Sequence, residues 1–305
     1  MKGNCGDILK VIMKEYDLNQ REMAEIMLLE PRQMSRIISG AQELDLVHLL
    51  ELVQNIGMPT EDLWVLFLET DEYKGYRIYR KIKRLIRDRK MDELAIVFAE
   101  FLETPLAEHK AMRQFVAYVQ VELDTHSPPE EVEGNIMAAL RIRNPDFDVD
   151  KVALYRLNYN EICLLICLAD QYEKLGNRSK AIALTKAMID SREYIKATEE
   201  DKAHLYPALL FNLATLVGTD KRYKEALKHC DTAIEICREY NNLIYAPDIL
   251  FLMVKCYFGL KEDEDIYRAF LIRAYYTALG HGNREFAMEI KSDAAKYLGI
   301  TDIRY

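Results

Sequence analysis

The 305-residue sequence has no apolar stretch long enough to cross a bilayer. Its longest apolar runs, such as 162–169, fall far short of the roughly 20 residues that a membrane-spanning helix needs. The first residues, Met1-Lys2-Gly3-Asn4, do not have the pattern of a signal peptide. We therefore expect a cytoplasmic protein with no membrane partner.

The sequence also lacks the short motifs that mark many catalytic sites. It contains no glycine-rich phosphate loop, no GxSxG or HExxH motif, and no Cys/His pair with a plausible third partner. Its carboxylates are numerous, but they lie among lysines on what we predict to be helix exteriors. We therefore expect that the protein is not an enzyme.

The sequence also lacks cysteines and histidines at the spacings that are typical of metal ligands. The six cysteines include no CxxC motif, and the six histidines are scattered. Cys163 and Cys167 would share a helix face, but no clustered histidine accompanies them. In a long chain without a signal peptide, most cysteines are buried small apolar residues. The sequence predicts no metal site and no cofactor.

Positive charge is in short supply as well. The formal net charge is −9, and residues 1–62 carry six basic against eleven acidic side chains, a net charge of −5. This balance argues against indiscriminate nucleic-acid binding over the whole surface, although it does not exclude a local element that binds a specific DNA sequence. Because phosphate neutralisation supplies much of the affinity for DNA, one copy of such an element would bind poorly, and two linked copies would be needed.

What the chain does contain is a helix-rich N-terminal region. The stretch 18–40 predicts two short helices, the second with Glu30 as N-cap, Pro31 as first helical residue and Gly40 after its end. Apolar spacing predicts further helices over 6–16, 44–56 and 60–69. The last of these carries the only tryptophan, Trp64, which we interpret as a core residue between domains in preference to a ligand platform.

The residues of 18–40 resemble the helix-turn-helix of the phage-repressor-like (XRE) family. The matching positions are Leu18-Asn19-Gln20, Ala24, Ser35-Arg36-Ile37 and Gly40. The sequence departs from the family at Leu28, where the turn usually has glycine, and at Glu30-Pro31, where a polar base reader is usual. The resemblance implies double-stranded DNA as a partner. We expect Arg32 and Arg36 at base edges, with Gln33 as a weaker candidate, and Gln20 and Arg21 at phosphates.

The segment 74–90 changes character sharply. It contains nine basic residues and a single acidic one, Asp88, and its isoleucines and leucines recur at helical spacing. We therefore predict an amphipathic helix with one basic face. A solvated face that offsets acidic neighbours is the favoured interpretation, and contact with DNA phosphates is the alternative.

The rest of the chain predicts one helix after another, with an internal repeat. Ala169 and Ala181 recur as Ala214 and Ala226 at the same offset, and a weaker third copy follows from Val254. Small residues at these places let antiparallel helices pack closely, and a period in the forties indicates a helical solenoid. The pattern resembles the tetratricopeptide repeat most strongly over 162–188.

The first helices of such repeats line a concave wall, so their inward positions are candidate ligand contacts. By resemblance to tetratricopeptide repeats, Asn212 would bond the main chain or terminal carboxylate of a bound peptide, unless it merely solvates its helix. Asn160 holds the equivalent place in the preceding copy. The expected peptide-binding residues are Asn160, Asn212, Tyr245, Asp248 and Lys255.

Together, the two halves resemble the Rgg and RNPP families of peptide-pheromone receptors. We therefore expect an all-α protein: a helix-turn-helix domain over 1–70, a basic linker helix over 71–90, and a right-handed α-solenoid of tetratricopeptide-like repeats over 91–305. The resemblance implies a homodimeric transcription regulator of the quorum-sensing type that responds to a short signalling peptide. Tyrosines near the C-terminus (Tyr267, Tyr275, Tyr276, Tyr297 and Tyr305) are candidates for the dimer contact. The alternative is a tetratricopeptide adaptor without specific DNA binding.

Overall fold

The computed structural model describes residues 5–44, 46–58, 70–88, 90–192 and 195–303. It divides into two compact units, Met1–Met112 and Arg113–Tyr305, so the division falls later in the chain than the predicted start of the repeats at residue 91. No strand forms in the described ranges, where the only β-type pairing is an isolated bridge between Asn158 and Lys196. None of the helices described there combines the length and hydropathy that crossing a bilayer requires.

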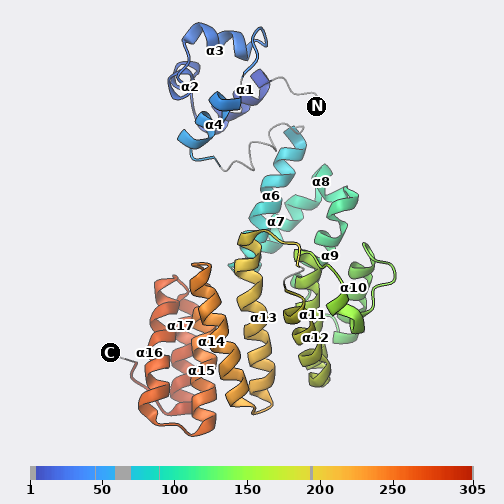
Figure 1. The fold of residues 1–305 in the computed structure, drawn as a ribbon, viewed down its shortest axis with the longest axis vertical. Coiled ribbons are helices and arrows are strands. Elements are labelled where there is room, and N and C mark those ends of the chain that lie inside the picture. Colours follow the sequence, from blue (N-terminus) through green and yellow to red (C-terminus); the bar gives the residue numbers. More distant parts are fainter. Residues whose placement is uncertain (1–4, 45, 59–69, 89, 193–194, 304–305) are drawn as a thin grey trace. The chain divides into compact units, whose positions relative to one another are not determined.

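Unit 1 begins with four short helices, followed by two longer helices and then two very short ones (Figure 1). The first four are α1 (Cys5–Glu15), α2 (Gln20–Ile26), α3 (Pro31–Ile38) and α4 (Leu46–Asn55). They are followed by α6 (Thr70–Arg87), α7 (Met91–Leu102), α8 (Pro105–Glu108) and the 3-10 helix η1 (Lys110–Met112). The predicted helix over 60–69, with Trp64, lies outside the described residues.

The four short helices enclose one apolar core, as their apolar spacing predicts. Its buried side chains come from every one of them: Ile8, Leu9, Ile12, Met23, Ala24, Met27, Met34, Ile37, Leu49, Leu52 and Val53, together with Met58 after α4. Burying side chains of this size removes about 1.5–3 kcal/mol of unfavourable hydration for each large one. This core fixes the angle at which α3 stands on α2.

Local capping explains where α2 and α3 begin. The side-chain oxygen of Asn19 accepts the backbone N–H groups of Arg21 and Glu22 at 2.9 and 3.0 Å, while Glu22 Oε2 accepts the N–H of Asn19 at 2.8 Å. Glu30 is the N-cap of α3 and Pro31 its first residue, as predicted. Gly40 follows the end of α3 with φ +74°, a conformation that glycine adopts without strain.

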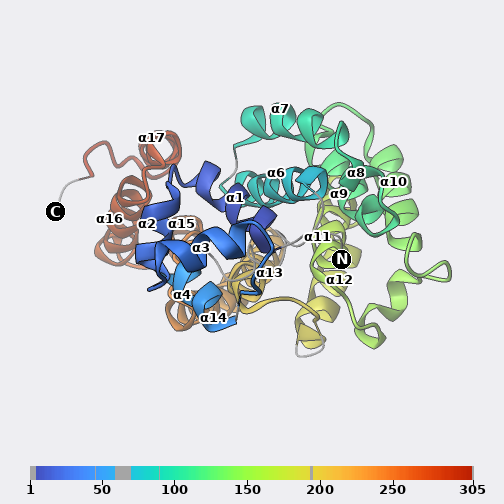
Figure 2. The ribbon, with the colours of Figure 1, turned by 90° about the horizontal axis from the view of Figure 1, so that it is seen from above.

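Unit 2 is built from antiparallel helix pairs. In chain order they are α9 (Arg113–Leu123) with α10 (Pro129–Arg141), α11 (Tyr159–Lys174) with α12 (Arg178–Asp190), α13 (Glu199–Thr219) with α14 (Tyr223–Glu239), and α15 (Ala246–Leu260) with α16 (Glu264–Gly280). The 3-10 helix η2 (Val149–Leu154) precedes α11, and α17 (Arg284–Asp293) and the π-helix η4 (Ala294–Leu298) follow α16. Seen from above, these pairs follow one another from α10 to α17 (Figure 2).

The repeat predicted from the sequence explains how the pairs pack. Ala169, Ala181, Ala214 and Ala226 are all buried, and the helices that carry them pack on one another, α11 on α12, α12 on α13 and α13 on α14. The first helices α9, α11, α13 and α15 also contact one another in succession. We call these four helices the inner row, because packing of the first helices against each other places them on the inner side of a solenoid's curve. The predicted all-α class, a helix-turn-helix followed by a solenoid, is confirmed.

Candidate nucleic-acid and ligand interfaces

The outer face of α3 presents the predicted base-reading residues. Met34 and Ile37 are buried in the core, which turns Arg32, Gln33 and Arg36 to the exposed side of the helix. Arg32 and Arg36 are four residues apart, so they stand on one face about 6 Å apart along the helix axis. A pair of guanidinium groups at this spacing has the reach and the donor geometry to read guanine edges in a major groove.

Gln33 differs from the two arginines. Its side-chain oxygen accepts the backbone N–H of Glu30 at 3.1 Å and so helps to cap α3. The amide nitrogen remains the donor that could face a ligand. The structure therefore gives Gln33 a capping contact that was not predicted from the sequence. Contact of Gln33 with a base edge stays a weaker prediction than that of the two arginines.

At the start of α2, Gln20 and Arg21 are both exposed. Arg21 Nε lies 3.2 Å from Glu25 Oε1, with 83% of the Arg21 side chain and 67% of the Glu25 side chain exposed. Ion pairs as exposed as this contribute little to stability, so a phosphate could replace the carboxylate at small cost.

Helix α6 has the predicted amphipathic pattern, although it begins four residues before the predicted Lys74. Ile82 and Leu85 are buried, whereas Lys74, Arg80 and Arg84 are exposed. Arg77 Nη1 lies 2.6 Å from Glu15 Oε1 of α1, which is the offsetting of an acidic neighbour that the favoured interpretation expected. Contact of the other basic residues with DNA phosphates stays the untested alternative.

Unit 2 contains a cavity of about 460 Å³ that is lined mainly by the inner row. We call it the inner-row pocket. Helix α13 contributes Phe211, Thr215, Gly218 and Thr219, and α15 contributes Asp248, Phe251, Leu252, Lys255 and Cys256. The lining is completed by Lys221 from the turn between α13 and α14, Tyr223 from α14 and Phe286 from α17. Its size lies within the range of about 300–1,000 Å³ that is usual for ligand sites.

Of the five residues expected to bind peptide, two line this pocket. Asp248 and Lys255 do so from α15. Tyr245 is the N-cap of α15 and joins it to α13, because its hydroxyl lies 3.1 Å from Nε2 of the buried His204. Asn212 is half-buried on α13, next to the lining residue Phe211, and Asn160 is half-buried in the first turn of α11; neither belongs to the lining. The peptide contacts stay a prediction for all five.

The inner row also has a cluster of polar side chains that was not predicted from the sequence, formed by Glu122, Cys167 and Asp170. Cys167 Sγ of α11 lies 3.4 Å from Glu122 Oε1 of α9, and burial raises the pKa of both groups. One turn along α11, Asp170 keeps contact with solvent, yet desolvation by the surrounding protein and then the charge of Glu122 raise its pKa to about 6. Within the described ranges, no group of three or more residues has the ligands for a metal ion.

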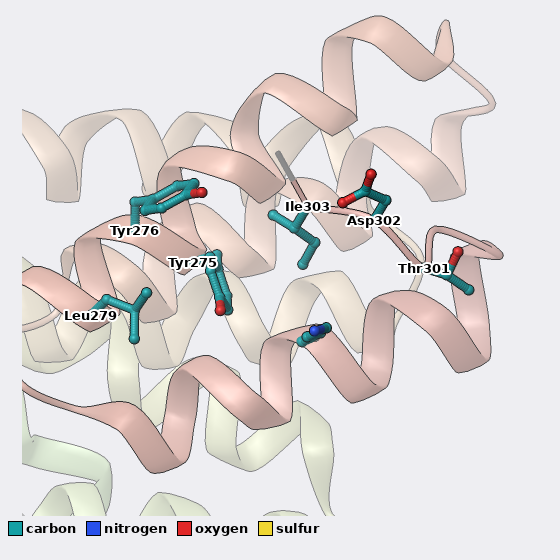
Figure 3. Close-up of a pocket in the computed structure, with 7 residues that line it drawn as sticks. Tyr275, Tyr276, Leu279, Thr301, Asp302 and Ile303 are labelled. Carbon is teal, nitrogen blue, oxygen red and sulfur yellow. The ribbon is translucent and has the colours of Figure 1, made fainter. Parts of the chain in front are cut away.

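A larger cavity, of about 600 Å³, lies at the C-terminal end of unit 2. Figure 3 shows Tyr275, Tyr276 and Leu279 projecting from α16 toward the final segment, which carries Thr301, Asp302 and Ile303. That segment is attached by Arg268, whose Nη2 donates to the backbone oxygen of Asp302 at 3.0 Å. We call this region the C-terminal recess. Two of the tyrosines predicted for a dimer contact therefore border one cavity.

Comparison with solved structures gives this arrangement a precedent. Bacillus thuringiensis PlcR in complex with the peptide PapR7 and DNA matches 94% of this chain and 98% of its own, at 18% identity and a TM-score of 0.63. ComR from S. thermophilus, in complex with DNA and its signalling peptide ComS, matches 94% and 97% at 14% identity and a TM-score of 0.56. The chain has the fold of PlcR and ComR.

A variant of the Streptococcus dysgalactiae SHP pheromone receptor Rgg2 shares this fold at 14% identity and a TM-score of 0.50, over 97% of this chain and all of the receptor chain. No protein-family model matches the sequence, and neither does any of the curated proteins compared with it. The likeness is thus one of architecture over nearly the whole chain. It confirms the predicted Rgg and RNPP type of architecture at the level of the fold.

Proposed function

We propose that the protein is a cytoplasmic, homodimeric transcription regulator that binds operator DNA through its helix-turn-helix and a short signalling peptide through its inner-row pocket. The proposal rests on two features found together in this chain: it has the fold of PlcR and ComR, and two arginines are exposed on the outer face of α3. Both of those proteins were crystallised with DNA and a peptide. We infer no catalytic activity and no cofactor.

The peptide half of the proposal rests on the chemistry of the inner-row pocket. An extended peptide brings unpaired N–H and C=O groups as well as side chains, so its site needs both apolar area and polar groups. The pocket offers three phenylalanines together with Asp248, Thr215 and two lysines. A wholly apolar cavity would favour a greasy small molecule instead.

The DNA half is tested by selecting bound sequences from a pool of randomised 20-base-pair duplexes, followed by affinity measurements by fluorescence anisotropy. Arg36→Ala should cost ~1–3 kcal/mol on the selected sequence and relax the preference at one base step, whereas Arg21→Ala should weaken selected and random duplexes alike. Arg141→Ala, at an exposed position of α10, is the control and should change neither affinity. Equal losses on both duplexes for Arg36→Ala would refute base reading.

A tetratricopeptide adaptor is the rival, and salt dependence separates the two. A DNA-binding regulator should lose affinity for duplex DNA steeply as salt rises, because binding releases counterions from the phosphates. An adaptor should show no salt-dependent retention on DNA at all. The peptide half has its own readout, since a peptide at 100 times its Kd should raise the free energy of unfolding by ~2.7 kcal/mol.

A further inference from the structure

The inner-row pocket has an aromatic floor contributed by three separate helices. Phe211 comes from α13, Phe251 from α15 and Phe286 from α17. The rings of Phe251 and Phe286 meet edge to face, with centroids 6.5 Å apart. Aromatic edges and faces of this kind pack well against another large apolar side chain. The floor therefore accommodates a bulky apolar group, and the whole cavity is too small to enclose an extended peptide of several residues.

The charges of the pocket are separated along its length. Asp248 and Lys255 lie seven residues apart on α15, which puts them about 10 Å apart along the helix axis. The end with Lys255 also contains Lys221, because the last turns of α13 lie beside that part of α15: a Cβ at Gly218 would stand 3.8 Å from Cys256 Sγ. One end of the pocket is thus acidic and the other is basic.

The two lysines differ in how far they are already neutralised. Lys255 Nζ lies 4.5 Å from the centroid of the Phe251 ring and 3.7 Å from Asp293 Oδ2, a long ion pair with both side chains substantially exposed. Lys221 makes no ion pair within the described ranges. The C-terminus of α13 and the N-terminus of α14 both lie next to Lys221, so their opposite dipoles offset each other. The ammonium groups therefore dominate this end and favour an anion.

We propose that the inner-row pocket recognises the C-terminal residue of a linear peptide: its large apolar side chain packs on the three phenylalanines, and its free carboxylate binds at Lys255 and Lys221. The carboxylate of Asp248 repels an anion at the opposite end and so fixes the direction of the chain. The preceding residues of the peptide extend along the inner row. The proposal rests on the proposed peptide-binding function and adds which end of the peptide is read and what residue stands there.

The test uses the full chain and synthetic heptapeptide libraries whose first six positions are random. One library ends in phenylalanine with a free carboxylate, a second ends in phenylalanine amide, and a third ends in aspartate with a free carboxylate. Peptides retained by the protein are counted by mass spectrometry. We expect at least tenfold more retention from the first library than from either of the others.

Matched variants assign the effect to the pocket. Lys255→Met combined with Lys221→Met keeps most of the length of both side chains without their charge, and it should abolish the preference for the free carboxylate over the amide. Lys228→Met, at an exposed position of α14 outside the pocket lining, should keep it. Thr219→Trp, at an exposed position of the lining, should fill the mouth and reduce retention from the first library.

Two results would overturn the proposal, and they are distinguishable from each other. Equal retention of acid and amide peptides that Thr219→Trp still blocks would mean that the pocket binds peptides without reading the terminus. Retention of no peptide from any library, by a protein that still binds its selected duplex, would refute the peptide half of the proposed function as well.

Discussion

Leu28 stands in the turn between α2 and α3 with φ +55° and an 80% exposed side chain. An L-residue in this left-handed conformation is less stable than glycine by about 1–2 kcal/mol, and Leu28 recovers little of that by burial. We predict that Leu28→Gly raises the free energy of unfolding by ~0.5–1 kcal/mol, the gain being reduced because glycine is more flexible in the unfolded chain.

Urea unfolding followed by circular dichroism measures this change. The matched control is Asp17→Gly, at another exposed position with positive φ (51°), because aspartate tolerates the left-handed region better than leucine does. Its stabilisation should therefore be smaller. An equal or larger gain at Asp17 would show that the conformation of Leu28 carries no special strain.

Asp170 should make the stability of unit 2 depend on pH. Its pKa in the folded protein is about 6, above the ordinary 3.8, because of desolvation and the charge of Glu122, which the nearby Lys174 only partly offsets. A raised pKa means that the folded state binds the proton more tightly, so stability is greatest below pH 4 for this group and falls as the pH rises from about 4 to 6.

Replacing the carboxyl by an amide removes this titration. Asp170→Asn should raise the free energy of unfolding at pH 7 by no more than ~1 kcal/mol, because solvent contact screens the group, and should leave the value at pH 4 nearly unchanged. Urea titrations at both pH values test this. Asp190→Asn, an exposed acid at the end of α12, is the control and should show no such difference.

The contrast between α3 and the Glu122 group shows what can be predicted for single residues. The exposed face of α3 follows from helical spacing alone, since Met34 and Ile37 fix which side is buried. The contact between Glu122 and Cys167 spans 45 residues and depends on how α9 packs on α11. No local pattern encodes that distance, so the raised pKa of Asp170 could not be predicted from the sequence.

At the scale of elements, α13 contains a proline that would ordinarily interrupt a helix. Pro207 has no N–H group to donate to the carbonyl four residues earlier, that of Ala203. The side chain of Asn242 supplies the missing donor, with Nδ2 lying 3.2 Å from the oxygen of Ala203. The segment after α14 thereby holds α13 in one piece, and α13 carries part of the inner-row pocket.

This contact predicts a specific coupling between Asn242 and Pro207. Asn242→Ala should lower the free energy of unfolding by ~1–3 kcal/mol, because it leaves the carbonyl of Ala203 without a donor. The loss should be clearly smaller when Pro207→Ala is also present, since the new backbone N–H can bond the same carbonyl. A double-mutant cycle by chemical denaturation measures the difference. Strictly additive losses would contradict this role of Asn242.

The elements themselves were largely predictable, because their signals are local. Asn19, Glu30 and Pro31 mark helix starts through their own side chains and backbone, and the repeat of Ala169 and Ala181 as Ala214 and Ala226 marks the helix pairs. The uninterrupted α13 could not be inferred in the same way. Its continuity across Pro207 depends on a donor from a residue 39 positions from Ala203.

At the scale of the whole molecule, the repeat architecture was predictable and the pocket was predictable only in part. Asp248 and Lys255 lie on one stripe of one helix, so their spacing places both on the inner wall. Phe286 reaches the same pocket from α17, which carries no copy of the repeat, and Lys221 reaches it from a turn. Their participation depends on the curvature of the solenoid and not on any periodic pattern.

At the same scale we expect a homodimer, and we predict that its two copies meet at the C-terminal recess. Tyr276 and Leu279 are 39% and 37% exposed beside a cavity of about 600 Å³. Aromatic residues are enriched at interfaces, and the buried centre of an interface is more apolar than its rim. Since the helix-turn-helix domain is acidic, dimerisation should raise the proposed affinity for operator DNA by linking two domains that each bind weakly.

Tyr276→Glu combined with Leu279→Glu would bury two carboxylates in such an interface, so we predict monomers at micromolar concentration by light scattering. The same variant should lose at least tenfold in affinity for a duplex with two half-sites and keep its affinity for a single half-site. Leu154→Glu, at a solvent-facing leucine of η2 that is 79% exposed, should remain dimeric. A wild-type protein that scatters as a monomer both with and without DNA would refute the dimer, whereas a dimer unaffected by the double substitution would place its contact elsewhere.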